Sequence, residues 1–130
     1  MAKALGAILS NVSMADIIPN LSVGIAAEAS DNIDVTIQFL DFDGTNLAGY
    51  HQVMFSVSDS QYGAFGTGIT DVSVTTGTLL YEQQVNRSGW AGSDSTGLLV
   101  MRFNFTSAGT RYLNLLTGSR WIVTSALTWA

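Results

Sequence analysis

The sequence lacks cysteine altogether and has a single proline and a single histidine in 130 residues. Without cysteine these residues form no disulfide, no thiolate metal site and no cysteine nucleophile. One histidine, His51, leaves little material for a histidine-rich metal site or a catalytic triad. No apolar run approaches the roughly 20 residues that a membrane-spanning helix needs, so no membrane partner is expected.

Charge is also scarce. Charged residues make up 12% of the chain, against about 25% in a typical globular domain. This low share excludes a disordered tail or an ordinary long solvated helix. Ten acidic and five basic side chains give a net charge of −5. A chain this acidic lacks the basic surface of a nucleic-acid binder, so no nucleic-acid partner is expected.

What the sequence has instead is hydrophobicity with a period of two. Leu98–Phe105 shows it most clearly, with apolar residues at every second position and Arg102 among the polar ones. This alternation is typical of a half-buried strand. Similar patterns predict strands over Leu21–Glu28, Ile33–Leu40, His51–Ser58, Asp71–Thr76, Thr78–Gln84, Thr110–Leu116 and Arg120–Trp129. Seven or eight strands at this spacing indicate one all-β domain, a sandwich or a barrel.

Two long stretches are predicted to be loops because glycine and serine dominate them. They are Ser58–Thr70 and Arg87–Gly97, and their composition favours no regular element. Met1–Leu9 faintly resembles a signal peptide, but its apolar run is short and leads straight into polar residues. We therefore interpret residues 1–20 as an N-terminal arm and residues 21–130 as the sandwich.

The stretch Asp34–Asp59 consists of a strand, an Asp-x-Asp-Gly turn, a short link to Gly49 and a second alternating strand. Together with Gly97–Leu113, it resembles the invasin/intimin type of bacterial immunoglobulin-like domain. The resemblance covers about residues 21–130 in order. It implies an immunoglobulin-like β-sandwich of seven or eight antiparallel strands, preceded by the N-terminal arm.

Three segments show a second and more specific resemblance: Val72–Leu80, Gly109–Leu115 and Val123–Ala130. They are similar to segments of small immunoglobulin-like proteins encoded among the structural genes of tailed bacteriophages. That family includes capsid decoration, cement and head-fibre proteins, which are usually trimeric. Two features depart from the pattern: Asn46-Leu47-Ala48 in the link, and the longer loop Arg87–Gly97.

Two aspartates are the weak candidates for a metal site. Asp41 and Asp43 lie in a loop and offer the hard oxygen ligands that Ca²⁺ prefers. The EF-hand spacing is missing, because no Glu closes the loop. We interpret the segment as an Asp-Gly turn whose carboxylates accept backbone N–H groups, and we predict no metal and no cofactor.

The sequence assembles no catalytic set. His51 has no G-x-S-x-G elbow nearby and no acid placed beside it by a motif. It is expected to lie, partly exposed, at the start of a strand. The order Gly63-x-x-Gly66-x-Gly68 lacks the strand-then-helix context and the lysine of a phosphate loop. We therefore predict a non-enzymatic protein.

The aromatic residues provide the candidates for partner contacts. Tyr62 and Phe65 lie in one glycine-rich loop and Trp90 in the other. Exposed Trp and Tyr are costly, yet they are favoured anchors of interfaces. The alternative is a loop that tucks over one end of the sandwich.

The last predicted strand adds two further candidates. Alternation places Trp121 and Trp129 on one face with Val123 and Leu127, while the opposite face is also apolar. A strand that is apolar on both faces is either central and covered or part of a subunit contact.

The resemblance implies a virion structural protein that decorates or cements a phage capsid. Its partners would be the major capsid protein and further copies of itself, as a homotrimer on the capsid surface. An adhesin or fibre module is the alternative, with Trp90, Tyr62 and Phe65 stacking on a carbohydrate. A hydrolase or lyase on a β scaffold is the third hypothesis, and nothing in the residues supports it.

Overall fold

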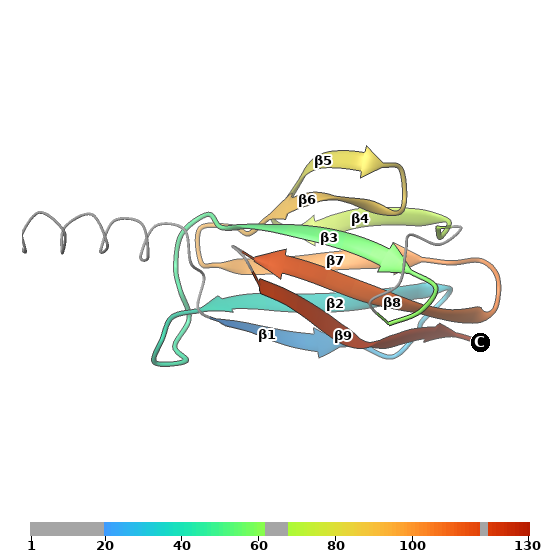
Figure 1. The fold of residues 1–130 in the computed structure, drawn as a ribbon, viewed down its shortest axis with the longest axis horizontal. Coiled ribbons are helices and arrows are strands. Elements are labelled where there is room, and N and C mark those ends of the chain that lie inside the picture. The colour runs from blue at the N-terminus through green and yellow to red at the C-terminus, as the bar shows by residue number, and fades with distance from the viewer. Residues whose placement is uncertain (1–19, 62–67, 118–119) are drawn as a thin grey trace, which may run out of the picture.

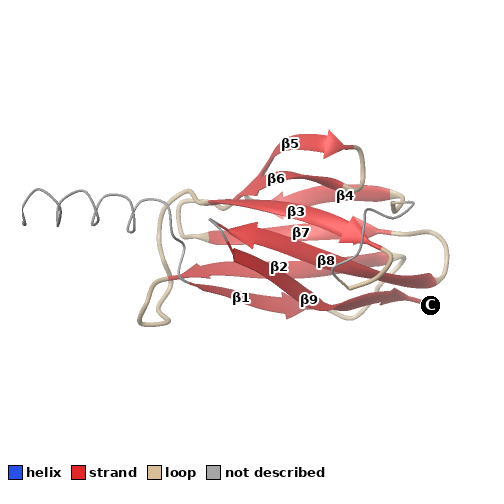
Figure 2. Cartoon of the chain, viewed as in Figure 1, coloured by secondary structure: helices blue, strands red, loops and turns tan. Residues whose placement is uncertain are grey.

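Nine strands form in the part of the chain that the computed structural model describes, residues 20–61, 68–117 and 120–130 (Figure 1). The described residues form strands, loops and turns and contain no helix (Figure 2). Accordingly, they provide no helix long and apolar enough to cross a bilayer. The strands are β1 Asn20–Ile25, β2 Asn32–Leu40, β3 Gln52–Ser58, β4 Asp71–Thr76, β5 Thr78–Gln84, β6 Ser88–Gly92, β7 Leu98–Asn104, β8 Gly109–Thr117 and β9 Arg120–Trp129.

The strands are arranged in two antiparallel sheets. One sheet has the order β1-β2-β7-β4, and the other has the order β5-β6-β3-β8-β9. The β2–β7 and β3–β8 pairs join strands that are distant in the chain. This spatial order is that of an immunoglobulin sandwich with two extra strands beside β3. The prediction of an antiparallel β-sandwich is confirmed.

The chain reaches the two extra strands by an unusual route. β4 and β5 are separated by Gly77 alone, yet they belong to different sheets. The chain therefore leaves the four-stranded sheet at Gly77 and returns along the outer edge of the five-stranded sheet. This route makes β5 an edge strand and places the β5–β6 hairpin beside β3 (Figure 1).

The core lies between the sheets and is built from the alternating apolar positions. In β2 and β7 every second residue is buried, as the period of two predicts, and in β3 the apolar alternation is buried together with Ser56 and Ser58. The largest fully buried side chains are Trp129, Phe39, Phe55, Phe103, Ile37, Leu99, Met101, Leu113, Leu115, Leu127, Val35 and Val53.

One predicted loop was wrong. The stretch Arg87–Gly97 contains the strand β6, so the sandwich has nine strands rather than seven or eight. Its inward positions are Gly89 and Ala91, and a Cβ at Gly89 would clash with the Tyr81 carbonyl oxygen. The close approach of β5 therefore requires a glycine at position 89. In a sequence, glycine indicates a turn or loop, so this strand was not predicted.

The expected single face of the last strand is also wrong. Tyr112 pairs with Ala126, and Asn114 pairs with Val123, so β9 contains one extra residue between these pairs. This bulge changes the alternation, because Leu127 is buried in the core while Ile122, an even-numbered residue, also packs against it.

Candidate functional site

The two outer faces of the sandwich differ in chemistry. On the four-stranded sheet, Arg102 donates from Nε and Nη2 to the two carboxylate oxygens of Asp34, at 2.7 and 2.9 Å. This hydrogen-bonded pairing lowers the pKa of Asp34 and raises that of Arg102. Thr36 and Gln38 continue the polar surface on β2. This face is mainly polar, with the half-buried Leu98 and Val100 of β7 as apolar positions beside Gln38 and Thr36.

The outer face of the five-stranded sheet carries a row of apolar side chains. Tyr81 of β5 pairs with Trp90 of β6, Trp90 with Met54 of β3, and Met54 with Leu116 of β8. We call these four residues the apolar row. Tyr81 is 62% exposed and Trp90 39%, whereas Met54 and Leu116 are half-buried. The next register position, on β9, is Trp121, whose side chain lies outside the described part of the structure.

The surroundings of the apolar row are uncharged. The described outward positions of β5, β6, β3 and β8 include no Asp, Glu, Lys or Arg. Gln52 and Thr78 lie on one side of the row, and each pairs with Gly92. Leu80, 47% exposed, lies over the same glycine, with its Cδ1 3.3 Å from where a Cβ would stand.

On the other side of the apolar row lies a buried polar row. Ser56 pairs with both Ser88 and Asn114. The Asn114 amide nitrogen donates to Ser58 Oγ at 2.9 Å, but Asn114 Oδ1 and Ser88 Oγ have no hydrogen-bond partner among the described residues. These two orphaned atoms are unusual, because buried polar groups in native proteins are nearly always paired.

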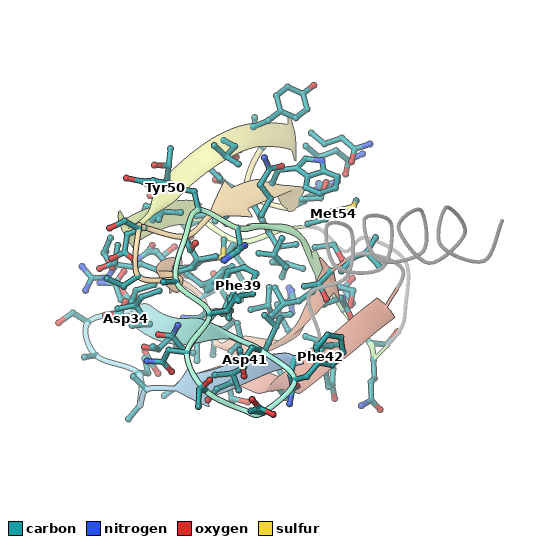
Figure 3. All side chains as sticks on the ribbon, turned by 90° about the vertical axis from the view of Figure 1, so that its left-hand side faces the viewer. Asp34, Phe39, Asp41, Phe42, Tyr50 and Met54 are labelled. Carbon is teal, nitrogen blue, oxygen red and sulfur yellow. The ribbon has the colours of Figure 1, made fainter. Side chains whose placement is uncertain are left out.

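A second surface is the sandwich end where the β2–β3 loop crosses (Figure 3). The Asp41 carboxylate accepts the backbone N–H of Asp43 and of Thr45, at 2.9 and 3.0 Å, and the Thr45 hydroxyl at 2.6 Å. These bonds, the Thr45 hydroxyl first, lower the pKa of Asp41. The interpretation of Asp41 as a turn residue is confirmed. Among the described residues, no group of three or more His, Cys, Asp or Glu side chains gathers as metal ligands.

The β6–β7 loop supports the β2–β3 loop through hydrogen bonds. Ser93 Oγ accepts the His51 N–H at 2.9 Å and donates to the Gly49 carbonyl at 3.0 Å. The Gly49 N–H donates to the Ser95 carbonyl at 2.7 Å. The His51 ring packs on Phe39 at 5.4 Å between centroids. His51 is half-buried just before β3, as expected, and it helps to hold the loop.

Two aromatic side chains stand out from this braced loop. Phe42 is 66% exposed and Tyr50 is 80% exposed. Figure 3 shows both at the end of the sandwich that faces the viewer. Sequence reasoning missed them, because Phe42 was counted as part of a turn and Tyr50 fell between the link that ends at Gly49 and the strand predicted from His51. The available signal was a large aromatic residue inside a turn-forming segment.

The outcome differs among the residues of this chain that were predicted to contact a partner. Tyr62 and Phe65 lie outside the described residues. Trp129 is 2% exposed, packs edge-on against Phe105 at 5.4 Å and donates from Nε1 to the Asp31 carbonyl at 3.0 Å. Trp129 is therefore a core residue that offers no surface to a partner, because its alternation places it between the sheets. Only Trp90 has a described and exposed side chain.

Comparisons with known proteins inform the fold alone. No protein-family model and no curated protein matches the chain. Among solved structures, a β-glucuronidase of Parabacteroides merdae is similar, with a TM-score of 0.54 and 16% sequence identity. The match covers 88% of this chain and 13% of that enzyme's chain. At this identity the likeness shows a shared sandwich fold and nothing about activity.

Proposed function

We propose that this protein is a non-enzymatic virion structural subunit that attaches to the outer surface of a phage capsid. Attachment is through the sandwich end formed by the Asp41–His51 loop. The proposal is supported by the sequence resemblance to phage decoration and cement proteins. The observation that carries it is the pair Phe42 and Tyr50, which are largely exposed on a hydrogen-bonded loop.

A braced loop suits attachment for an energetic reason. Binding costs free energy when mobile side chains and loops must be ordered at the interface. Here the loop is already held by Asp41 within its turn and by Ser93 and Ser95 from the neighbouring loop. Large aromatic side chains on such a support bury much apolar area at little further entropic cost.

The described part of the sandwich begins at this same end. β1 begins at Asn20, which pairs with Leu40, and Leu40 directly precedes Asp41. Residues 1–19 therefore connect to the domain beside the exposed aromatic loop. In the proposed function, the arm and the loop contact the same capsid shell. Binding to the assembled shell stabilises that shell by mass action.

Co-sedimentation tests the proposal. The purified full chain is mixed with shells assembled from the major capsid protein encoded by the same genome, both unexpanded and expanded. We expect the chain to sediment with shells, and the double variant Phe42→Ala/Tyr50→Ala to bind at least about tenfold more weakly. Tyr81→Ala removes an aromatic side chain that is 62% exposed on the sheet face, and it is the matched control.

Two results would contradict the proposal. One is a wild-type chain that stays in the supernatant with both kinds of shell. The other is a double variant that binds as tightly as the wild type. The homotrimer remains a prediction, and light scattering after size-exclusion chromatography measures it directly.

A further inference from the structure

We propose that the apolar row is a second binding site, for an uncharged oligosaccharide laid across the strands of the five-stranded sheet. Trp90 and Tyr81 stack on the apolar C–H faces of the sugar rings. This site is separate from the sandwich end through which the proposed function attaches the protein. It assigns the protein a further binding activity.

The absence of charge selects the class of ligand. The chain carries a net charge of −5, yet the described outward positions around the apolar row have no charged side chain. Nucleic acid, anionic sugars and anionic lipid all require cationic partners, which the described outward positions of β5, β6, β3 and β8 do not present. An uncharged ligand with apolar and hydrogen-bonding parts matches the face.

The geometry of Tyr81 adds an independent observation. The β5–β6 pairing is irregular on both sides of it, between Leu79 and Tyr81 and between Glu82 and Gln84. Bulges bend a strand locally and re-aim side chains, and they are frequent next to functional sites. Here they bring Tyr81 opposite Trp90, so two aromatic rings stand on neighbouring strands about 5 Å apart at their Cβ atoms.

Polar side chains of the right kind flank the rings. Gln52, Thr78 and Gln84 are all exposed and uncharged. Amides and hydroxyls both donate and accept, as sugar hydroxyl groups do. Pockets for small ligands commonly combine an apolar surface with a few such polar groups.

The size of the strip formed by the described side chains suits a small ligand better than a protein partner. Over β5, β6, β3 and β8, whose outward side chains are described, the strip beside the buried polar row is about 19 Å long and about 14 Å wide, from strand spacing and residue rise. This is about 270 Å², well below the roughly 800 Å² per partner in a standard protein interface. The area suits a chain of a few sugar rings.

Affinity electrophoresis of the full chain in gels containing soluble neutral polysaccharides tests the proposal. The probes are a mixed-linkage β-glucan, a xylan, a galactomannan and a dextran, with polygalacturonate as the anionic comparison. We expect at least one neutral polymer to retard the protein and polygalacturonate to leave it unretarded. Calorimetry with the matching oligosaccharide then measures affinity.

Variants locate the site. Trp90→Ala should weaken binding at least tenfold, Trp90→Phe should retain most of it, and Tyr81→Ala should weaken it severalfold. Phe42→Ala/Tyr50→Ala is the matched control and should bind like the wild type, so failure here and failure of capsid attachment are distinguishable. Circular dichroism checks that Trp90→Ala is folded, and Tyr81, on an edge strand, gives a second test.

Three outcomes would overturn the proposal. They are retardation by none of the neutral polymers, retardation by polygalacturonate alone, and undiminished binding by folded Trp90→Ala and Tyr81→Ala variants.

Discussion

Asp41 and Asp94 begin two turns that share one hydrogen-bond pattern at the same end of the sandwich. In each turn the Asp N–H donates to the carbonyl of the residue four positions later, at 2.9 Å. Each Oδ1 accepts two backbone N–H groups, and a threonine hydroxyl donates to the carboxylate at 2.6 Å. A glycine with positive φ stands at the fourth position of both turns. The motif Asp-x-x-Gly thus builds both loops that brace each other.

The first prediction concerns pH. Hydrogen bonds from Thr96 and from the Leu98 N–H lower the pKa of Asp94 in the folded state. A depressed pKa contributes stability above the unfolded value of about 3.9, and that stability is lost as the pH falls through the lower folded value. Asp94→Asn should therefore lower the Tm at pH 7, and the difference from wild type should shrink on acidification below pH about 4.

Thermal unfolding followed by circular dichroism at pH 7 and at pH about 2.5 measures this difference. Asp43→Asn is the control, because Asp43 contributes its backbone N–H to the turn. A constant Tm difference between Asp94→Asn and wild type at both pH values would contradict the role of the carboxylate charge.

The second prediction concerns Gly97, which has a φ of 80°. A Cβ there would clash with the Leu47 carbonyl oxygen. Gly97→Ala should destabilise the protein by about 2 kcal/mol or more, because both the backbone conformation and the space exclude a side chain. Gly24→Ala is the control, since a Cβ there meets nothing within 4 Å. Urea unfolding compares the two, and equal midpoints would refute the argument.

The third prediction concerns Trp129. Trp129→Ala should cost about 3–5 kcal/mol, because it leaves a large cavity beside Phe105. Trp129→Phe should cost less, since the Asp31 carbonyl that loses the indole N–H still accepts the Phe105 N–H at 3.0 Å. Urea unfolding measures both. A small loss for Trp129→Ala would contradict its place in the core.

The fourth prediction compares two buried serines. Ser88 Oγ has no hydrogen-bond partner in the part of the chain that the structure describes, whereas Ser93 Oγ bonds His51 and Gly49. Removing an unpaired buried hydroxyl is neutral or favourable, so Ser88→Ala should leave stability unchanged or raise it by up to about 1 kcal/mol. Ser93→Ala should cost about 1–2 kcal/mol, because it leaves two backbone groups unpaired. The reverse order in chemical denaturation would count against this assignment.

Local alternation accounts for what could be predicted of the fold. The ranges Asp71–Thr76, Thr78–Gln84 and Arg120–Trp129 have the bounds that the sequence predicts. β6 escaped prediction because Gly89 is required by the close approach of β5, a tertiary constraint. The bulge in β9 escaped for a similar reason, since it exists only relative to the pairing with β8.

The candidate sites were less predictable. Trp90 was identified from its type, but its neighbours Tyr81 and Met54 belong to segments 9 and 36 residues away by sequence number, and only the pairing registers bring them together. Phe42 lies in a segment whose turn chemistry was recognised, and Tyr50 lies just before a predicted strand. Their exposure depends on how the braces from Ser93 and Ser95 hold the loop.

The sequence by itself determined that this protein is an all-β domain of the sandwich or barrel kind, because a period of two and Asp-Gly turn chemistry act over a few neighbouring residues. It also determined that the surface carries little charge. Only the tertiary structure decided how charged and apolar side chains are distributed over the surface. An ion pair lies on the outer face of one sheet, and an aromatic row lies on the outer face of the other. Register and sheet crossover depend on contacts between distant segments, and no local pattern encodes them.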